Sequence, residues 1–321
     1  MQRKSQITKI SPQITCLRAE NPSPMTGTGT NSYLLRGTKG AVLIDPGPDL
    51  DPHLEAILHQ IGETRLVAIL ITHAHLDHSA LAPRLAKISG APMLAAGAVW
   101  EGRSDMMQRL AALGLDEAGE GLDHSFVPDQ RIRDGQTLHL AGLNITVIAT
   151  PGHLSGHLSF ALGQTLFSGD HVMGWSTSLV SPPSGDMRAY MASLAKLQTQ
   201  GWQVFLPGHG APVSDPAARL AELIELDEKL EHNQDADGCR ARATAELDAE
   251  TTLLADNVPE ARRKAKASLQ PQQEPQPQPQ QKSMPAPEPE PEPESVQEQE
   301  QVPVQASARE VEAQPPPLVL F

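Results

Sequence analysis

The histidine-rich segment at residues 73–78 follows directly on the most apolar stretch of the chain. Residues 66–72 read LVAILIT, and residues 73–78 read HAHLDH, which holds three histidines and one aspartate. An apolar run that does not alternate with polar residues is typical of a strand covered on both faces of a sheet. The sequence therefore predicts a layered α/β domain in which a buried strand ends in a cluster of ionisable side chains.

The other predicted elements arrive in groups of strands with helices between them. Apolar or alternating runs predict strands at 7–18, 32–37, 41–44, 66–72, 93–95, 136–139, 144–149, 158–162, 165–168 and 202–206. Helical spacing of apolar residues predicts helices at 51–62, 80–88, 102–113 and 185–199 and after Ser214. Asp51 and Ser214 are predicted N-caps. This order favours two sheets packed together with helices outside, a four-layer αββα sandwich.

Composition divides the chain into three predicted regions. Residues 1–225 carry all the predicted strands, whereas 226–268 are polar and weakly periodic, which predicts a marginal helical extension. The remaining segment, 269–321, is rich in Pro, Gln and Glu. Such a segment buries too little apolar surface to offset the entropy of ordering, so it is predicted to be a disordered tail. Its apolar end, PPPLVLF, is a candidate docking peptide for a protein partner.

Several classes of protein are disfavoured by what the sequence lacks. It contains no run of 18 apolar residues, which argues against a membrane span, and its amino terminus lacks the apolar stretch of a secretory signal. Two cysteines, Cys16 and Cys239, are too few for a disulfide framework, which favours a cytoplasmic location. The formal net charge of −14 argues against a nucleic-acid partner.

Four polar groups stand where predicted strands end, and together they predict a metal site. The first is HAHLDH, in which alternate residues of an extended segment point the same way, so His73 and His75 can converge on one ion. The others are TPGHLSGH at 150–157, FSGDH at 167–171 and LPGHG at 206–210. Each alone is also consistent with a polar loop. Imidazole and carboxylate together suit zinc, iron or manganese.

These motifs resemble those of the metallo-β-lactamase superfamily of hydrolases, in its glyoxalase II and ribonuclease Z-like branch. Asp45, HAHLDH, His153, Asp170 and His209 occur in the order of that superfamily's five motifs. The stretches NPSPMTGTGTNSYLL, TPGHLSGHLSF and LPGHGAP are similar to the β-lactamase-like protein 2 subgroup. The resemblance implies that 1–225 is a catalytic domain and that 226–268 is the remnant of a winged-helix-like domain.

The resemblance also implies a role for each motif residue. The first metal ion would be held by His73, His75 and His153. The second would be held by Asp77, His78 and His209, with Asp170 bridging the two. Asp45 is not expected to be a ligand, and would brace the histidine loop through hydrogen bonds. The expected cofactor is two zinc ions, with iron or manganese as alternatives.

Two ions that share a ligand can bind one hydroxide between them, and that hydroxide can attack a carbonyl carbon or a phosphorus atom. Asp77 is then also a candidate catalytic residue, because it can accept a hydrogen bond from the nucleophile. Four further residues are candidate substrate contacts, with a purely structural role as the alternative: His157, His171, Trp175 and Ser178. The histidines outside the motifs, His53 among them, are predicted to lie at the surface.

Four functions are compatible with this reading. The preferred one is a dinuclear metal-dependent hydrolase acting on a small-molecule ester or thioester. Cleavage of single-stranded RNA is a second, which the acidic chain disfavours. A sulfur dioxygenase with a single iron is a third, because such relatives share the first motif. A non-catalytic metal-binding protein that recruits partners through its tail is the fourth.

Overall fold

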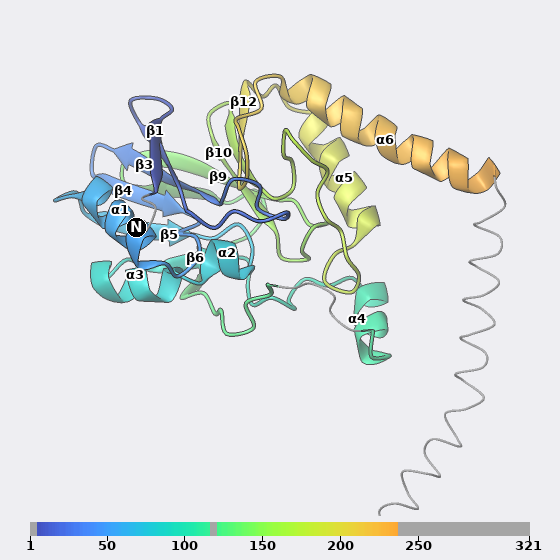
Figure 1. Cartoon of the computed structure of the whole chain (residues 1–321), viewed down its shortest axis with the longest axis horizontal. Coiled ribbons are helices and arrows are strands. Elements are labelled where there is room, and N and C mark those ends of the chain that lie inside the picture. The colour runs from blue at the N-terminus through green and yellow to red at the C-terminus, as the bar shows by residue number, and fades with distance from the viewer. Residues whose placement is uncertain (1–4, 116–120, 237–321) are drawn as a thin grey trace, which may run out of the picture. The chain divides into compact units, whose positions relative to one another are not determined.

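The computed structural model describes residues 5–115 and 121–236, with side chains described up to residue 226 (Figure 1). All of them belong to the first of two compact units, Met1–Thr252. The predicted extension at 226–268 is described only as far as Ala236, and the predicted tail at 269–321 lies outside the described residues. Within the described part of the chain, no helix is long and apolar enough to cross a membrane.

Two β-sheets form the centre of the fold. A seven-stranded sheet has the order β1-β2-β3-β4-β5-β6-β7 and a five-stranded sheet has the order β12-β11-β10-β9-β8. The first sheet consists of β1 (Gln6–Lys9), β2 (Ile14–Arg18), β3 (Asn31–Gly37), β4 (Gly40–Ile44), β5 (Leu66–Leu70), β6 (Met93–Ala95) and β7 (Gln130–Arg131). The second consists of β8 (Thr137–Leu140), β9 (Leu143–Ala149), β10 (Leu158–Leu162), β11 (Thr165–Gly169) and β12 (Val204–Pro207).

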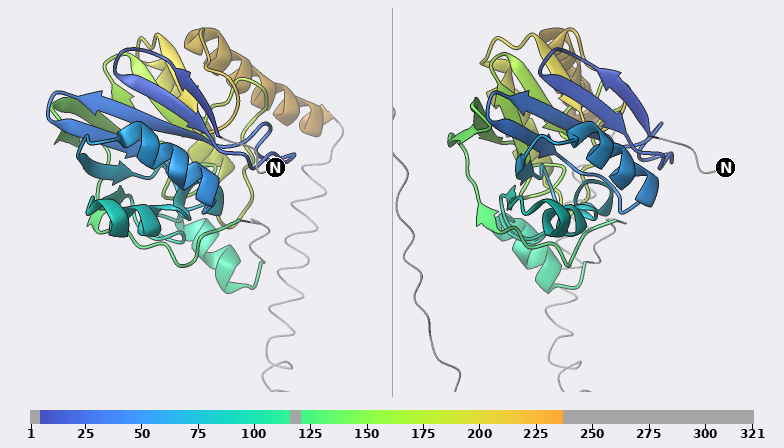
Figure 2. Two further views of the ribbon diagram at one scale, coloured as in Figure 1. Left: turned by 60° about the vertical axis from the view of Figure 1, so that its left-hand side comes forward. Right: turned by 90° about the vertical axis from the view of Figure 1, so that its left-hand side faces the viewer.

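Helices cover the outer faces of both sheets (Figures 1 and 2). On the first sheet lie α1 (Asp51–Ile61), the short α2 (Leu76–Ser79) and α3 (Ala82–Ser89). On the second lie α5 (Met187–Gln198) and α6 (Pro216–Ala236), while α4 (Asp105–Ala112) is peripheral. These four layers confirm the predicted αββα sandwich.

Three apolar clusters hold the layers together, one at each interface. Leu43 and Ile69 of the first sheet pack against Ile57 of α1. Alternate residues on the same strands face the second sheet, so the middle cluster contains Leu70 together with apolar residues of the second sheet. The third cluster joins Leu166 and Phe205 of the second sheet to α5 and α6. The apolar run at 66–72 is thus buried on both faces, as predicted.

Local details differ from the predictions where a turn or a cap intervenes. The strand predicted at 7–18 is two strands, β1 and β2, joined by a turn in which the Ser11 hydroxyl accepts bonds from the amides of Gln13 and Ile14. Helix α1 follows Leu50, with Asp51 inside the helix and no side-chain cap. At α6 the cap is Asp215 instead of Ser214, because the Asp215 carboxylate accepts from the amide of Ala218 at 3.0 Å.

The two sheets meet at the end where the predicted motifs lie. The amide of Leu158, at the start of β10, donates to the carbonyl of Thr72, just after β5, at 2.8 Å. The amide of Asn31, at the start of β3, donates to the carbonyl of Gly208, just after β12, at 2.7 Å. These bonds between sheets fix the loops that carry the ionisable side chains against one another.

Candidate metal centre

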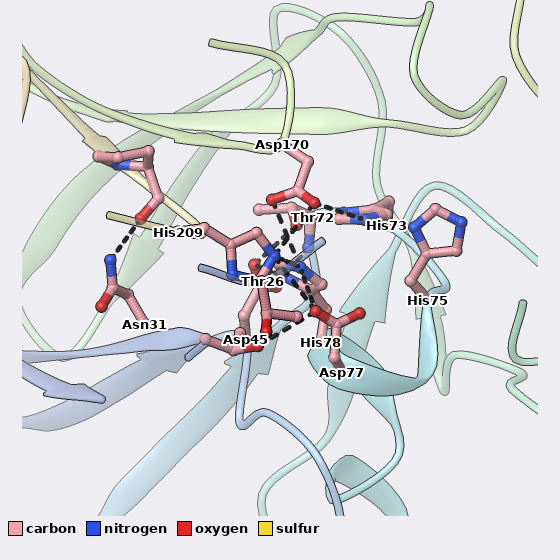
Figure 3. A network of polar contacts seen from close by, with 12 residues as sticks. Thr26, Asn31, Asp45, Thr72, His73, His75, Asp77, His78, Asp170 and His209 are labelled. Atoms are coloured by element: carbon pink, nitrogen blue, oxygen red, sulfur yellow. Dashed lines mark hydrogen bonds and ion pairs between the residues drawn. The ribbon is translucent and has the colours of Figure 1, made fainter. Parts of the chain in front are cut away.

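The first sheet supplies four of the candidate ligands through the segment after β5 (Figure 3). His73 lies in the bend after β5, and His75 lies on extended chain immediately before the helix α2. One turn of helix then brings Asp77 and His78 back toward the same point. His73 is 2% exposed and His78 is fully buried, so both imidazoles are removed from water.

The second sheet supplies the other three candidate ligands from three loops. His153 comes from the β9–β10 connection, Asp170 follows β11 and His209 follows β12. The loop before His209 must approach closely, because a Cβ atom on Gly208 would lie 2.4 Å from Asp170 Oδ1 and 2.6 Å from His78 Cε1. Only glycine fits between the two sheets at this point.

The candidate ligand atoms form three overlapping groups, and within each group all atoms lie within 4.8 Å of one another. The groups are His73, His75 and His153; His73, His78 and Asp170; and Asp77, His78 and His209. The first and third match the two ligand sets that the resemblance implies. The structure thus brings together all seven residues of the predicted metal site.

Asp170 lies close to ligand nitrogens of both sets, and Figure 3 shows its carboxylate pointing toward the other labelled ligands. Its Oδ2 is 3.3 Å from His209 Nε2, 3.8 Å from His153 Nε2 and 3.9 Å from His73 Nε2. Its Oδ1 is 3.4 Å from His78 Nε2. A carboxylate with nitrogens from both ligand sets around it has the position expected of a bridging ligand.

Asp45 orients two of the histidines, so that each directs Nε2 into the cluster. His78 Nδ1 lies 2.9 Å from Asp45 Oδ2 and donates its proton there. The Thr72 hydroxyl donates to the same oxygen at 2.7 Å, so it can only accept from His73 Nδ1, which is 2.9 Å away. Asp45 also accepts from the Thr72 amide at 2.8 Å. The carboxylate therefore holds the histidine loop and keeps Nε2 of both rings turned toward the cluster, where each can bind a metal ion in place of a proton.

Backbone carbonyls orient two more histidines in the same sense. His153 Nδ1 donates to the carbonyl of Leu179 at 2.6 Å, and His209 Nδ1 donates to that of Gly29 at 3.3 Å. Each leaves Nε2 facing the cluster, where His153 Nε2 lies 3.0 Å from His75 Nδ1. Metal-binding histidines characteristically bond through their second nitrogen in this way.

The residues present fit a metal ion. His73 Nε2 and Asp170 Oδ1 are buried without a hydrogen-bond partner in the described structure. Buried polar atoms are normally satisfied, so such atoms side by side point to a ligand that they would share. The donors are imidazole nitrogens and carboxylate oxygens, a set that suits zinc, iron or manganese.

The electrostatics of the cluster favour a cation as well. Burial lowers the pKa of His209, but the Asp170 and Asp77 carboxylates outweigh it and raise the pKa to about 9. Burial and the neighbouring His153 lower the pKa of His75 to about 3. Although burial opposes it, the charge of His209 and His78 holds the pKa of Asp170 well below its usual range. The Asp170 and Asp77 carboxylates thus hold positive charge in a nearly dry site, which is charge that a bound metal ion would also supply.

The predicted substrate contacts separate into two kinds. Trp175 and Ser178 line a cleft of about 530 Å³ in front of the cluster, and Ser178 donates to the backbone carbonyl of Asp170 at 2.6 Å. His157 and His171 do not line this cleft and are 1% and 0% exposed. His157 Nε2 instead accepts from the amide of Asp170 at 3.2 Å, so it positions the bridging candidate.

Sequence reasoning missed a contribution from the turn at 21–31. Thr30 Oγ1 donates to Asp77 Oδ2 at 3.1 Å, and the Asn31 side-chain amide donates to the carbonyl of Gly210 at 2.9 Å. The turn therefore positions Asp77 through a direct hydrogen bond, and it positions the loop that carries His209 through a bond to the backbone of that loop. Glycine, threonine and asparagine in a turn carry no periodic signal that reveals such contacts.

The structure also corrects the prediction that His53 lies at the surface. Its side chain is 1% exposed, with Nδ1 2.9 Å from Ser5 Oγ and Nε2 2.9 Å from Ser32 Oγ. His53 precedes Ile57 and Ile61 by four and eight residues, so it lies on the buried stripe of α1. This helical spacing could have predicted from the sequence that His53 is buried.

Comparisons with known proteins agree with the geometry. Residues 25–209 match the model of the metallo-β-lactamase superfamily, and the chain belongs to that superfamily, which confirms the resemblance. A β-lactamase domain protein from Burkholderia ambifaria has a similar fold, with a TM-score of 0.59 and 24% identity over 72% of this chain and 79% of that one.

Two curated relatives are more informative about chemistry. An atrochrysone carboxyl ACP thioesterase of Aspergillus chevalieri is 31% identical over 67% of this chain, and the match spans 62% of the relative's length. A β-lactamase-like protein 2 homolog of Drosophila melanogaster is 29% identical over 68% of this chain and 71% of its own length.

Proposed function

We propose that this chain is a metal-dependent hydrolase that cleaves a thioester or related ester of a small molecule. The observation that carries the proposal is that five of the seven candidate ligands open onto one cleft: His75, Asp77, His153, Asp170 and His209. The other two, His73 and His78, lie behind them and are buried. A substrate in the cleft would therefore meet the metal site directly.

Two zinc ions are the proposed cofactor, with iron or manganese as alternatives. His73, His75 and His153 would hold one ion, Asp77, His78 and His209 would hold the other, and Asp170 would bridge them. Ions bound there would supply Lewis acidity, which polarises a carbonyl and lowers the pKa of water.

Asp77 is the proposed catalytic residue among the side chains. Its carboxylate is 26% exposed, against 10% for Asp170, so it reaches the cleft surface. The Thr30 hydroxyl and His209 Nε2, at 3.1 and 3.2 Å, hold its Oδ2. Its Oδ1 can then accept a hydrogen bond from an attacking water and orient that water toward the carbonyl.

The walls of the cleft favour an acyl substrate. Met25, Leu76, Trp175 and Leu179 line it and are each 46% to 59% exposed, which is much apolar surface to leave in water. None of the described lining residues is Lys or Arg, so apart from the proposed metal ions an RNA backbone would find no cationic side chain there. The thioesterase names of relatives at about 30% identity also support a thioester.

The test is a metal titration combined with a substrate panel. The full-length protein is stripped with a chelator, reloaded with zinc, iron or manganese, and assayed on thioesters, esters and single-stranded RNA. We expect thioester turnover that reaches its maximum at two metal ions per chain. A maximum at one ion would contradict the dinuclear centre. Oxygen uptake with a persulfide at one iron per chain would favour a sulfur dioxygenase.

A matched pair of variants links turnover to the site. His73→Ala removes a buried candidate ligand, whereas His59→Ala removes an exposed histidine of α1. Loss of turnover and of metal in the first variant alone is the expected result. Full metal content with no turnover on any substrate in the wild-type protein would favour a non-catalytic metal-binding role.

A further inference from the structure

A second cavity of about 530 Å³ shares Trp175 with the metal cleft, and part of its lining is one face of β1, β2 and β3 in the seven-stranded sheet. In the strand register, Gln6 pairs with Arg18 and Arg18 pairs with Asn31, while Thr8 lies two residues along β1 from Gln6. All four residues line the cavity. Because side chains alternate along a strand, they project from the same face of β1, β2 and β3.

Arg18 sets the charge of this cavity. It is the one charged side chain among the described lining residues, and none of those residues is Asp or Glu. Its Nε is buried without a hydrogen-bond partner, and its side chain makes no ion pair within the described part of the chain. Burial raises the pKa of the nearby Cys16 thiol to about 12, so that group adds no negative charge.

An unpaired guanidinium in a cavity is unusual in a chain with a net charge of −14. Taking a cation partly out of water costs free energy unless an anion compensates it. The planar guanidinium matches a phosphate or carboxylate group, because two N–H bonds can point at two oxygens. The amide side chain of Gln6 and the hydroxyls of Thr8 and Thr28 offer further polar contacts in the same cavity.

Trp175 connects this cavity to the metal cleft, because it lines both. Its ring is held between two glycines. A Cβ atom on Gly210 would lie 2.5 Å from Trp175 Cδ1, and one on Gly27 would lie 3.5 Å from Cζ2. The indole therefore packs close to both glycines and forms a wall common to the two cavities, with candidate ligands lining one and Arg18 lining the other.

We propose that the Arg18 cavity binds an anionic oxygen group, a phosphate or a carboxylate, at the end of the substrate's thiol arm. The acyl group lies in the apolar cleft at the metal site, and the arm passes Trp175. This inference rests on the proposed thioester hydrolysis and adds the charge of the substrate to it. The substrate class is a thioester of an acidic thiol carrier.

Kinetics on three thioesters with one common acyl group test this proposal. Coenzyme A carries phosphates, glutathione carries carboxylates and N-acetylcysteamine carries no charge. In Arg18→Gln we expect KM to rise about tenfold for the anionic ester that the cavity fits, relative to the neutral one. A rise for the coenzyme A ester alone identifies phosphate, and a rise for the glutathione ester alone identifies carboxylate.

A matched control separates local contact from long-range charge. Lys9→Gln also removes one positive charge, from the neighbouring strand β1, but Lys9 alternates with Thr8 and so faces away from the cavity. We expect the Lys9 variant to behave like the wild-type protein. Equal effects of the two variants, or equal effects of Arg18→Gln on charged and neutral esters, would overturn the proposal. Arg18→Lys keeps the charge, and should restore part of the affinity if packing is intact.

A binding measurement keeps this test independent of turnover. Desulfo-coenzyme A lacks the thiol that could bind a metal ion, and its affinity for the metal-loaded full chain can be measured by calorimetry. Tight binding that is lost in Arg18→Gln supports the cavity even if no thioester is hydrolysed, a result that would refute only the proposed function. Thioester hydrolysis with no effect of Arg18→Gln on any ester and no effect on desulfo-coenzyme A binding would refute the cavity and leave the proposed function standing.

Discussion

The metal centre and the buried face of α1 both hold histidine side chains away from water, but they use the imidazole ring in different ways. In the centre, His78 bonds Asp45 through Nδ1 and directs Nε2 at two further carboxylates. Beneath α1, His53 uses both ring nitrogens in hydrogen bonds to serine hydroxyls. The first arrangement leaves Nε2 available to a metal ion, whereas the second leaves neither ring nitrogen available.

The difference teaches that burial alone does not mark a metal ligand. What distinguishes the two regions is whether the second nitrogen of the ring is already used and whether other ligand atoms surround it, as they do in the metal centre. His171 is a third case, because it is fully buried and neither ring nitrogen has a hydrogen-bond partner in the described structure. It lies against Tyr190, with ring centroids 4.8 Å apart, and so packs as an aromatic ring.

The largest effect is expected from Asp170→Asn, which removes the charge at the centre of the cluster and keeps the shape. An amide is a poor bridging ligand, and it no longer offsets the repulsion between two cations. We expect loss of at least one metal ion and a fall in turnover of about a thousandfold or more, which corresponds to roughly 4 kcal/mol. Metal analysis and turnover on the same sample check this. Full metal content with near-normal turnover would remove Asp170 from the bridging position.

A smaller effect is expected from Asp45→Asn, which disturbs the orientation of the histidines without touching a ligand. Asp45 has φ of 48°, a left-handed conformation that asparagine tolerates, so the backbone should keep its course. The amide has one accepting oxygen, so it cannot accept from His78 and the Thr72 hydroxyl on one side and from the Thr72 amide on the other, as the two carboxylate oxygens do. Metal affinity and turnover should each fall about 10- to 100-fold. Unchanged metal affinity would show that the loop holds its shape without this carboxylate.

The position of the metal site could be predicted from sequence because it depends on strand ends. The apolar run at 66–72 marks a covered strand, and the polar segment after it must emerge at the end of the sheet. The loops containing His153, Asp170 and His209 each follow a strand in the same way. The order of these motifs along the chain was therefore enough to predict where in the fold the metal site lies.

The direction of individual side chains could not be predicted, because it depends on contacts between distant segments. His157 and Ser178 both lie near glycine or serine in polar loops, yet one is behind Asp170 and the other lines the cleft. Arg18 gains its position from pairing with Gln6 and Asn31 across three strands. No local sequence pattern predicts that these three residues lie side by side across the sheet.

A still smaller effect on turnover is expected from His171→Phe. Phenylalanine keeps an aromatic ring against Tyr190 and removes two nitrogens that have no hydrogen-bond partner in the described structure. We expect turnover within about threefold of the wild-type value, which is less than 1 kcal/mol. The same assay and metal analysis as for Asp170→Asn apply. A large loss of metal would show that His171 bonds to the site and would place it with the cluster histidines.

The smallest effect on turnover is expected from His53→Gln, which should act on stability alone. Burial lowers the pKa of His53 to about 4, below the value of about 6.5 for an unfolded histidine. Between these values the unfolded chain binds a proton that the folded chain does not, so the free energy of unfolding falls as the pH falls. The expected loss from this one group between pH 6.5 and 4 is about 3 kcal/mol.

Urea unfolding of the wild-type protein and His53→Gln across that pH range tests this expectation. The variant should be the less stable protein at pH 7.5, because glutamine cannot fill the ring's place between Ser5 and Ser32. The difference in unfolding free energy between the two proteins should become smaller toward pH 4, since only the wild-type protein loses the stabilisation that His53 contributes. Groups in the metal centre titrate in both proteins and cancel in the difference, while His59→Gln controls for removing an exposed histidine of α1. A difference in unfolding free energy that stays constant with pH would mean that His53 is protonated as readily in the folded chain as in the unfolded one. The contrast between the metal centre and the buried face of α1 would then rest on hydrogen bonding alone.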